Sequence, residues 1–497
     1  MTIRFGIWID NEERDAASGR YFASIDPSNG QPWAEVAAGG AADVDAAVKS
    51  SQLAFDNAEW RWMEPSARRR LLLNIAARIR ANIDELAEVE SRDAGKLLKE
   101  CRLHVEAASE WFEYFAGMTD KVCGQTIPSD AGVFNYTTLE PYGVVGAIVP
   151  GNSPLLLTVW KLAPALAAGN TVVVKPSEYT SGSIITLMRK LVDLLPPGVI
   201  NVVCGDGVEA GSAMVDHQGI RKIFFTGGPG HGAAVAQGAG KRLVSTILEL
   251  GGKSANIVFA DAQREKALAG VMAGVFAATG QTCMAGSRVL IEESIFDEFV
   301  ATLVERTKSI RIGHPAGADT DVGPIGTQKQ LDRVAGLVER ALADGARLLT
   351  GGKRAEVPGH AGGYYYEPTI LVGTSNQDYI CREEIFGPVM TIMPFKTDAE
   401  ALAIANDSDF GLVAGLWTSD LYRAQEFSRK LDVGTVFLNL YRKVAPQTPF
   451  GGRGNSGYGR ENGFAVMNEY MQIKSVLMDV DRDRIQNPFT MRVGSAR

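Results

Sequence analysis

Residues 142–250 alternate short apolar runs with helical stretches bounded by proline or glycine, and this feature restricts the possible folds most strongly. The runs are continuously apolar, which is typical of strands that helices cover on both faces. This succession predicts a parallel sheet of the α/β class, with strands at 144–149, 171–174, 199–203, 220–225 and 243–250. Ligands bind such sheets at the carboxyl ends of the strands.

The same alternation continues to about residue 450 and predicts a second α/β region. Strands are expected there at 255–259, 287–291, 388–393, 413–417 and 435–438, and helices at 263–278, 293–309 and 328–344.

Residues 66–117 predict two helices, because Leu71, Ile75 and Ile79 recur at helical spacing and Gly95 is a typical helix end. Residues 118–141 predict a β-hairpin around the turn Ser129-Asp130-Ala131-Gly132. The run that begins at Met471 predicts one more strand, followed by a mobile tail.

Charge and cysteine content exclude several classes of protein. The 50 basic and 58 acidic residues give a net charge of −8 without a basic stripe, so nucleic acid is not expected as a partner. Five cysteines without a C-x-x-C pair argue against disulfides and against a zinc site, so no metal is expected. No stretch of about 20 uncharged apolar residues occurs, which predicts a cytoplasmic protein with reduced thiols and no membrane contact.

Cys283 lies in the small-residue loop 280–286. Such a loop leaves a thiol accessible and lets backbone N–H groups point at the atom that the sulfur attacks. A buried, inert cysteine is the more frequent situation for a lone cysteine, so the neighbouring motifs must decide between the two.

Glu249 ends an expected strand and precedes two glycines. A carboxyl group among apolar neighbours has a raised pKa and can serve as a general base. A structural ion pair with Lys253 is the alternative. A phosphate-binding loop ending at Gly252-Lys253-Ser254 is excluded, because Ile247 stands where that motif requires glycine.

Three further motifs follow strand ends. Asn152, between Pro150 and Pro154, could donate its amide to an oxyanion or could be an ordinary turn residue or helix cap. Lys175 and Glu178 could meet ligand hydroxyls or form a solvated pair. The glycine-rich turn after Phe225 could bring backbone N–H groups close to a phosphate.

Seven motifs occur together and in order. They are Pro150-x-Asn152, Lys175-Pro-Ser-Glu178, Phe225-Thr-Gly227, Glu249-Leu-Gly-Gly-Lys253, Gly280-Gln-x-Cys283, Glu384-Ile-Phe386-Gly-Pro388 and Pro449-Phe-Gly-Gly452. This set resembles the NAD(P)-dependent aldehyde dehydrogenase superfamily over nearly the whole chain, and the residues around Cys283 resemble a bacterial catabolic branch of it.

The resemblance implies a fold of three parts. A Rossmann-like NAD-binding domain would comprise 1–117 and 142–250, a catalytic domain 251–452, and a small β oligomerisation arm 118–141 with 468–497. It also implies a homodimer or homotetramer.

The resemblance further implies a mechanism. Cys283 would attack the aldehyde, Asn152 would hold the oxyanion, and Glu249 would activate the water that hydrolyses the thioester. The cofactor would contact Pro150, Lys175, Glu178, Gly227, Gly228, Leu250, Glu384 and Phe386. A carboxylate at the ribose 2′-hydroxyl favours NAD, although NADP is possible through Lys175.

The substrate side departs from the usual family pattern, because Gly151 and Ser153 replace two aromatic residues around Asn152. This change predicts a wider, more polar site and a functionalised substrate such as a semialdehyde or a lactol. Ser153, Thr282 and Met284 are the substrate-contact candidates.

Three alternative functions remain. A CoA-acylating aldehyde dehydrogenase would typically lack the base at Glu249, and a non-catalytic NAD-binding protein would have lost Cys283, Glu249 or Asn152. A cysteine hydrolase needs a histidine near the thiol, and no histidine stands in a recognisable motif with Cys283.

Overall fold

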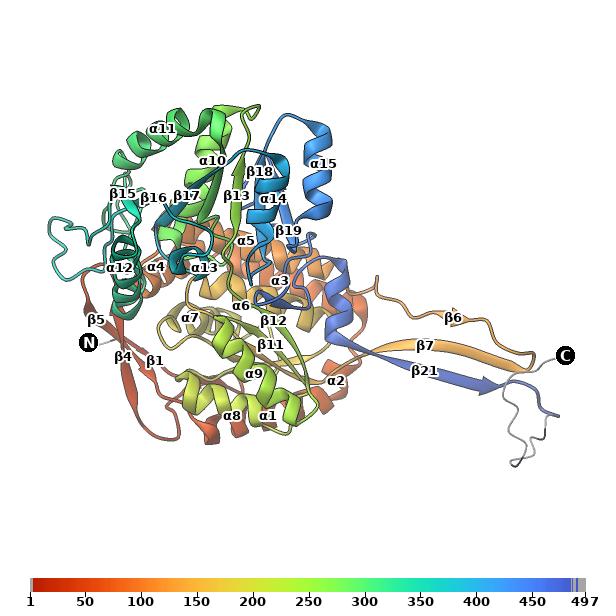
Figure 1. Ribbon diagram of the computed structural model, residues 1–497. Coiled ribbons are helices and arrows are strands. Elements are labelled where there is room, and N and C mark those ends of the chain that lie inside the picture. The colour runs from red at the N-terminus through yellow and green to blue at the C-terminus, as the bar shows by residue number, and fades with distance from the viewer. Residues whose placement is uncertain (1–2, 484, 486–488, 490–497) are drawn as a thin grey trace.

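The computed structural model describes residues 3–483, 485 and 489. Two large sheets with their helices form the body of the molecule, and a long β arm projects from it (Figure 1). The α/β fold expected from the sequence is confirmed. The domain boundaries themselves remain predictions.

The first sheet has eight strands, and its central strands β8 to β12 run parallel. All five expected strands are present. In spatial order the sheet comprises β20 (Gly457–Tyr458), β12 (Ser245–Glu249), β11 (Lys222–Thr226), β8 (Val144–Ile148), β9 (Thr171–Lys175), β10 (Ile200–Val202), β2 (Ile7–Ile9) and β3 (Glu12–Arg14).

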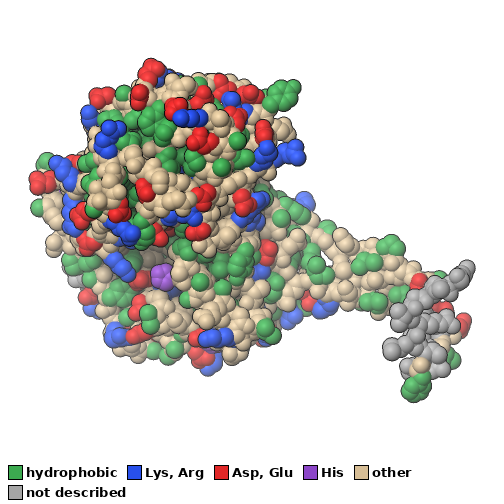
Figure 2. Space-filling view, viewed as in Figure 1, with side chains coloured by type: hydrophobic (Ala, Val, Ile, Leu, Met, Phe, Trp, Pro, Cys, Tyr) green, Lys and Arg blue, Asp and Glu red, His purple; other side chains and the backbone are tan. Residues whose placement is uncertain are grey.

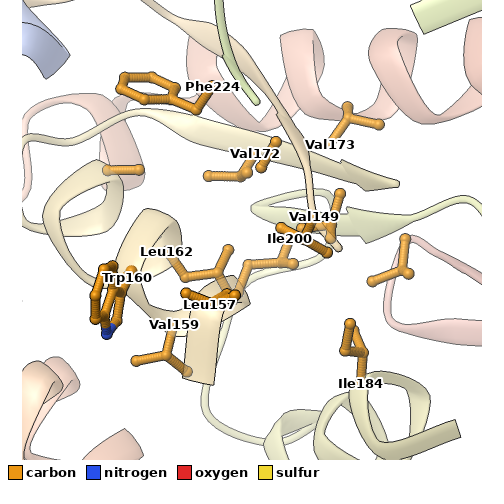
Figure 3. Packing of buried hydrophobic residues seen from close by; sticks show 14 of the residues in the cluster. Val149, Leu157, Val159, Trp160, Leu162, Val172, Val173, Ile184, Ile200 and Phe224 are labelled. Atoms are coloured by element: carbon orange, nitrogen blue, oxygen red, sulfur yellow. The ribbon is translucent and has the colours of Figure 1, made fainter. Parts of the chain in front are cut away.

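Helices cover this sheet on both faces. As a consequence, every residue of the central strand β9 is buried. Helix α1 packs against β9 and β10, whereas α6 packs against β8 and β9. In Figure 3, Leu157 and Leu162 of α6 lie together with Ile200 of β10. The helices of this region are α1 (Ala41–Asp56), α2 (Ala58–Arg61), α6 (Pro154–Ala167), α7 (Gly182–Leu191), η1 (Gly207–Gly211), α8 (Ser212–Asp216) and α9 (Pro229–Lys241).

The second sheet has seven strands, parallel except for the edge pair β15–β16. The five strands expected between 255 and 438 are present, and β15 and β16 were not expected. In spatial order the sheet comprises β15 (Arg347–Thr350), β16 (Thr369–Val372), β17 (Val389–Phe395), β14 (Arg288–Glu292), β13 (Ala255–Val258), β18 (Val413–Trp417) and β19 (Thr435–Leu438).

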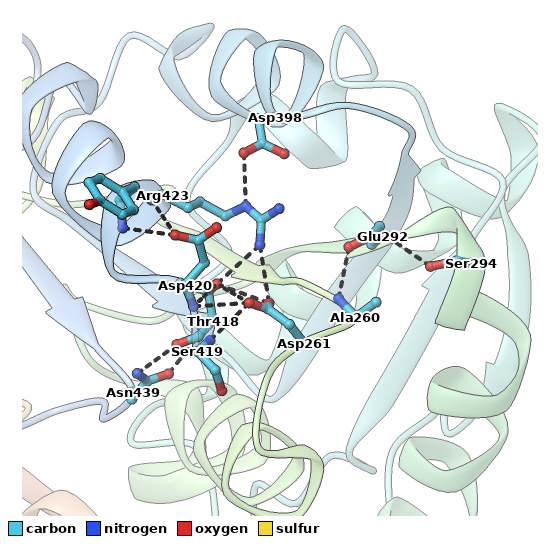
Figure 4. A network of polar contacts seen from close by, with 11 residues as sticks. Ala260, Asp261, Glu292, Ser294, Asp398, Thr418, Ser419, Asp420, Arg423 and Asn439 are labelled. Atoms are coloured by element: carbon cyan, nitrogen blue, oxygen red, sulfur yellow. Dashed lines mark hydrogen bonds and ion pairs between the residues drawn. The ribbon is translucent and has the colours of Figure 1, made fainter.

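A satisfied polar network closes one end of the second sheet (Figure 4). Asp261 accepts hydrogen bonds from the Thr418 hydroxyl and two backbone N–H groups, and Arg423 joins it to Asp398. This network holds helices in place. The helices of this region are α10 (Arg264–Phe276), η2 (Ala277–Gly280), η3 (Glu293–Ile295), α11 (Phe296–Lys308), α12 (Gln328–Ala343), α13 (Tyr379–Arg382), α14 (Asp398–Asn406) and α15 (Leu421–Lys430). The later η4 (Phe464–Tyr470) packs against α6 of the first region.

The expectation of one helix up to Gly95 is wrong, because two helices occupy that segment. Helix α3 (Pro65–Arg80) ends at a turn, where Asn82 donates its side-chain amide to the Arg78 carbonyl, and α4 (Ile83–Ala94) begins after it. Gly95 does end α4, in the left-handed conformation. Helix α5 (Leu98–Ala116) follows, and an unexpected three-stranded sheet of β1 (Ile3–Phe5), β5 (Gln31–Ala37) and β4 (Tyr21–Asp26) precedes them.

The hairpin expected at 118–141 is present as β6 (Thr126–Ile127) and β7 (Val133–Pro141). The expected C-terminal strand, β21 (Met471–Asp479), pairs with β7 along its whole length. Hydrophobic side chains are exposed on this arm (Figure 2), including Phe134, Ile473 and Leu477. Most of the expected mobile tail lies outside the described residues.

The apolar stretch 144–174 forms a strand, a helix and a strand, as its prolines predict. Within the described residues, no helix is long and apolar enough to span a membrane.

Candidate active site

A strained turn after α10 presents the thiol of Cys283. Ala278, Thr279 and Gly280 all have positive φ angles, of 54°, 56° and 69°. A Cβ atom at Gly280 would lie 2.1 Å from the Gly387 carbonyl oxygen, so only glycine fits there. Strain of this kind persists only where the surrounding structure enforces it, and here it leaves Cys283 partly exposed.

The surroundings of Cys283 favour the protonated thiol. Burial raises the pKa of the Cys283 thiol well above its usual value, and the carboxylates of Glu249 and Glu384 raise it further. A hydrogen bond from the Met284 backbone N–H acts in the opposite direction. Attack by sulfur therefore requires a group that takes the thiol proton.

Glu249 is positioned to take that proton. It is the last residue of β12, and only 2% of its surface is exposed. Its charge acts on the Cys283 thiol, and its buried Oε1 has no hydrogen-bond partner among the described residues. Burial raises the pKa of Glu249 to about 7, while the Lys161 ammonium opposes this shift. The alternative pairing with Lys253 is wrong, because the buried Lys253 ammonium has no hydrogen-bond partner among the described residues.

Lys161 is a site residue that the sequence analysis missed. Its ammonium, on α6, donates to the Thr226 hydroxyl and to the Glu461 carboxylate, each at 2.8 Å. The side chains of Lys161 and Glu461 are each 1% exposed. The available signal was a single lysine inside an apolar helix, since such a charge is buried only with a partner.

Asn152 reaches across to the nucleophile loop. Its amide nitrogen donates to the Gln281 carbonyl at 3.0 Å, two residues before Cys283. Because Ser153 and not Asn152 precedes α6, the helix-cap alternative is wrong. The Lys96 ammonium holds this loop by donating to the Asn152 carbonyl at 2.9 Å and to the Ser153 hydroxyl at 2.6 Å.

A cleft of about 700 Å³ opens at the carboxyl ends of β8, β9 and β11. Helix α9 begins in the same cleft, and no side chain caps its amino terminus, so its first N–H groups are available to an anion. The Lys175 ammonium lies 3.3 Å from the Glu178 carboxylate. Of the expected cofactor residues, the cleft is lined by Pro150, Lys175, Glu178, Gly227 and Gly228.

The other three expected cofactor residues lie outside this lining. Leu250 packs so closely under α9 that a Cβ atom at Gly232 would lie 2.5 Å from its side chain. Glu384 accepts a hydrogen bond of 3.2 Å from the Gly252 backbone, and burial raises its pKa to about 7. Phe386 lines a smaller cavity of about 190 Å³ together with Asn152.

The model of the aldehyde dehydrogenase family matches residues 14–476 of this sequence. The chain belongs to the aldehyde dehydrogenase family.

Relatives of this aldehyde dehydrogenase cover nearly its whole length. (Z)-2-((N-methylformamido)methylene)-5-hydroxybutyrolactone dehydrogenase of Acinetobacter baylyi is 41% identical, over 98% of this chain and 100% of that protein. A crystal structure of a putative aldehyde dehydrogenase from Burkholderia cenocepacia has a TM-score of 0.95 and 42% identity, covering 99% of this chain and 100% of that one.

The crystal structure of PnpE from Pseudomonas sp. WBC-3 has a TM-score of 0.95 and 41% identity, covering 98% of this chain and 100% of that one. A second structure of PnpE is a complex with nicotinamide adenine dinucleotide.

The substrate candidates are largely buried in this aldehyde dehydrogenase. Thr282 and Met284 are 8% and 9% exposed, and the Met284 carbonyl accepts a hydrogen bond from Tyr441 at 3.0 Å. The hydroxyl of Ser153 is already bonded to Lys96. Three basic residues that the sequence analysis did not single out add polar groups near the nucleophile. They are Lys96, His104 and Arg442.

No group of three or more His, Cys, Asp or Glu side chains in the described part of the chain is arranged to hold a metal ion.

Proposed function

We propose that this aldehyde dehydrogenase oxidises an aldehyde to its carboxylic acid with NAD, through a thioester at Cys283. One observation carries the proposal: a buried carboxyl group with a pKa of about 7 and an unpartnered oxygen, that of Glu249, acts on the thiol of Cys283, and the amide of Asn152 reaches the same loop. A nucleophile, a base and an oxyanion donor thus lie together at the edge of a cofactor-sized cleft.

The cleft fits a dinucleotide. Lys175 and Glu178 would bind the adenosine ribose, the N–H groups at the start of α9 would bind the pyrophosphate, and Glu384 with Phe386 would hold the nicotinamide ribose. The complex of PnpE with nicotinamide adenine dinucleotide supports NAD as the cofactor. When bound, NAD accepts the hydride that leaves the substrate carbon. The Glu178 carboxylate favours NAD over NADP, because it would repel a 2′-phosphate.

The residues of the chain perform the remaining steps. Glu249 takes the thiol proton, sulfur bonds to the aldehyde carbon, and the carbonyl oxygen becomes an oxyanion held by Asn152 and by the Cys283 backbone N–H. After the hydride leaves, the thioester remains on Cys283. Glu249 releases the first proton to solvent and then removes a proton from water, which attacks the thioester, releases the acid and returns the thiolate.

Lys161 would be a positioning residue for the base. Its buried positive charge lowers the pKa of Glu249 against the effects of burial and of Glu461. Without this charge, burial would hold Glu249 protonated at neutral pH, and a protonated carboxyl cannot accept a proton.

The alternative functions fit less well. Glu249 beside Cys283 favours water over CoA as the acceptor of the acyl group. A non-catalytic role is disfavoured because all three reacting groups are present. In the described part of the chain, none of the histidines is hydrogen bonded to Cys283, which argues against a cysteine hydrolase.

A functionalised substrate, such as a semialdehyde or a lactol from a catabolic pathway, is part of the proposal. The Acinetobacter baylyi relative, named as a hydroxybutyrolactone dehydrogenase, supports a substrate of this kind. We further propose that the β arm joins subunits into a dimer or tetramer, since its apolar side chains are exposed. The cytoplasmic location remains a prediction from the sequence.

Replacing the nucleophile tests the reaction. Cys283→Ser should abolish NADH formation from every aldehyde while NAD still binds, because a serine hydroxyl lacks the acidity and nucleophilicity of the thiol. Absorbance at 340 nm measures turnover, and calorimetry measures NAD binding. Turnover by the variant at more than about one hundredth of the wild-type rate would refute the assignment of Cys283.

A further inference from the structure

Three basic residues from separate parts of the chain converge beside the nucleophile. Lys96 lies between α4 and α5, His104 lies on α5, and Arg442 follows β19. The Lys96 ammonium is 3.2 Å from His104 Nδ1, and the positive charge of Arg442 acts on His104, Lys96 and Cys283. None of the three lines the cofactor cleft. Lys96 lines instead the smaller cavity of about 190 Å³ that also contains Asn152.

The nearby carboxylates do not form ion pairs with Lys96 or Arg442. His104 is a neutral donor here, because burial and the charges of Lys96 and Arg442 lower the pKa of its imidazole well below the usual value. Within the described residues, neither Lys96 nor Arg442 has a carboxylate oxygen within 4.0 Å. Glu100 accepts a hydrogen bond of 3.0 Å from the Ala278 backbone, and Glu90 accepts one of 3.1 Å from the Leu155 backbone. Burial also raises the pKa of Glu90 to about 7, so its negative charge is only partial at neutral pH.

Arg442 retains most of its hydrogen-bonding capacity. In the described part of the chain its guanidinium makes one hydrogen bond, a long one of 3.3 Å to the Ala273 carbonyl. A guanidinium has five N–H donors in a planar fork, which matches a carboxylate. The backbone of Arg442 is left-handed, with φ of 60°, and the preceding Tyr441 hydroxyl is bonded to the Met284 carbonyl. Arg442 is thus tied to the nucleophile loop in a strained conformation.

We propose that Arg442, with His104, binds a carboxylate at the far end of the substrate, so that this enzyme oxidises aldehydes that carry a second, anionic group. The inference rests on the proposed function and narrows its substrate class to a carboxylate-bearing semialdehyde, in preference to a neutral lactol. Lys96 is a positioning residue, because its ammonium already holds the Asn152 loop.

A matched pair of aldehydes tests the inference. 4-Oxobutanoate and butanal have the same carbon number and differ in the terminal carboxylate. The wild-type kcat/KM should be at least about tenfold higher for 4-oxobutanoate, since a hydrogen bond to a charged group contributes that much or more. Arg442→Gln should raise KM for 4-oxobutanoate about 10- to 100-fold and leave KM for butanal within about threefold.

Lys443→Gln is the matched control, because it removes one positive charge from the exposed neighbouring residue. It should leave both KM values within about threefold. Arg442→Lys keeps the charge and should restore part of the affinity for 4-oxobutanoate. An equal change of KM for both aldehydes in Arg442→Gln, or a wild-type enzyme that does not prefer 4-oxobutanoate, would overturn the inference.

One measurement uses the wild-type protein alone. In the wild type, raising the salt concentration should increase KM for 4-oxobutanoate more than KM for butanal, because salt screens the attraction. Equal salt effects would count against the anion subsite.

In calorimetry, succinate, a four-carbon dicarboxylate, should bind the wild-type protein. It should bind Arg442→Gln more weakly. If no aldehyde is oxidised at all, the proposed function fails, whereas succinate binding that depends on Arg442 would still support the subsite. Succinate binding that is absent, or unchanged in the variant, would refute it.

Discussion

Replacing Glu249 by glutamine should separate the two halves of the reaction. Glutamine keeps the size of the side chain but cannot accept a proton, and a general base contributes about 10²- to 10⁴-fold to a rate. The steady-state rate should therefore fall by that factor. A burst of NADH stoichiometric with active sites should remain, because solvent can take the thiol proton in place of Glu249 before the first turnover.

The pKa of Glu249 sets the size of the accompanying pH effect. With a pKa of about 7, the carboxyl is about one tenth ionised at pH 6 and about nine tenths ionised at pH 8. The base acts only when deprotonated, so wild-type turnover should rise about tenfold across this range. The residual rate of Glu249→Gln should lack this step.

Stopped-flow absorbance at 340 nm measures the burst and the steady state in one experiment. Glu305→Gln is the control, because this exposed carboxylate on α11 pairs with Lys308 at the surface. A steady-state rate of Glu249→Gln within about threefold of the wild type, or a wild-type rate that is flat between about pH 6 and pH 8, would refute the assignment.

Two further substitutions test the cofactor cleft and the buried charges. Glu178→Gln should raise kcat/KM for NADP relative to NAD about tenfold in steady-state assays, because it removes a like charge near the 2′-phosphate; an unchanged ratio would contradict this contact. Glu90 has a pKa of about 7 in the fold against 4.5 unperturbed. The folded protein therefore holds its proton more tightly, and unfolding free energy falls by about 3 kcal/mol as pH rises from 4.5 to 7. In calorimetry, the difference between the Tm at about pH 5 and the Tm at about pH 8 should be smaller for Glu90→Gln than for the wild type. Equal differences for the two proteins would contradict this.

Local patterns predicted much of the fold. The continuous apolar runs marked the central strands of both sheets, because only strands covered on both faces have that pattern. Gly95 marked a helix end, since its left-handed backbone favours glycine. The break at Asn82 and the edge strands β15 and β16 escaped prediction, because a helical pattern runs on through 81–82 and the edge strands carry no regular alternation.

The candidate site was predicted only in part. Cys283, Glu249 and Asn152 stood in recognisable motifs, and the structure brings their loops together. No local signal was strong enough to single out Lys161, Glu461, His104 and Arg442. The sequence around a polar residue does not indicate which distant side chain it will face in the fold.

The sequence by itself determined the α/β class, the order of the strands along the chain, and the motifs that mark the nucleophile and the base. The tertiary structure alone decided the chemistry of those groups. Burial beside Lys161 and Glu461 set the pKa of Glu249, and the folding of the loop after β19 brought the positive charge of Arg442 within reach of the Cys283 thiol. Electrostatic energies depend on distance and on the exclusion of water, and both are properties of the folded chain.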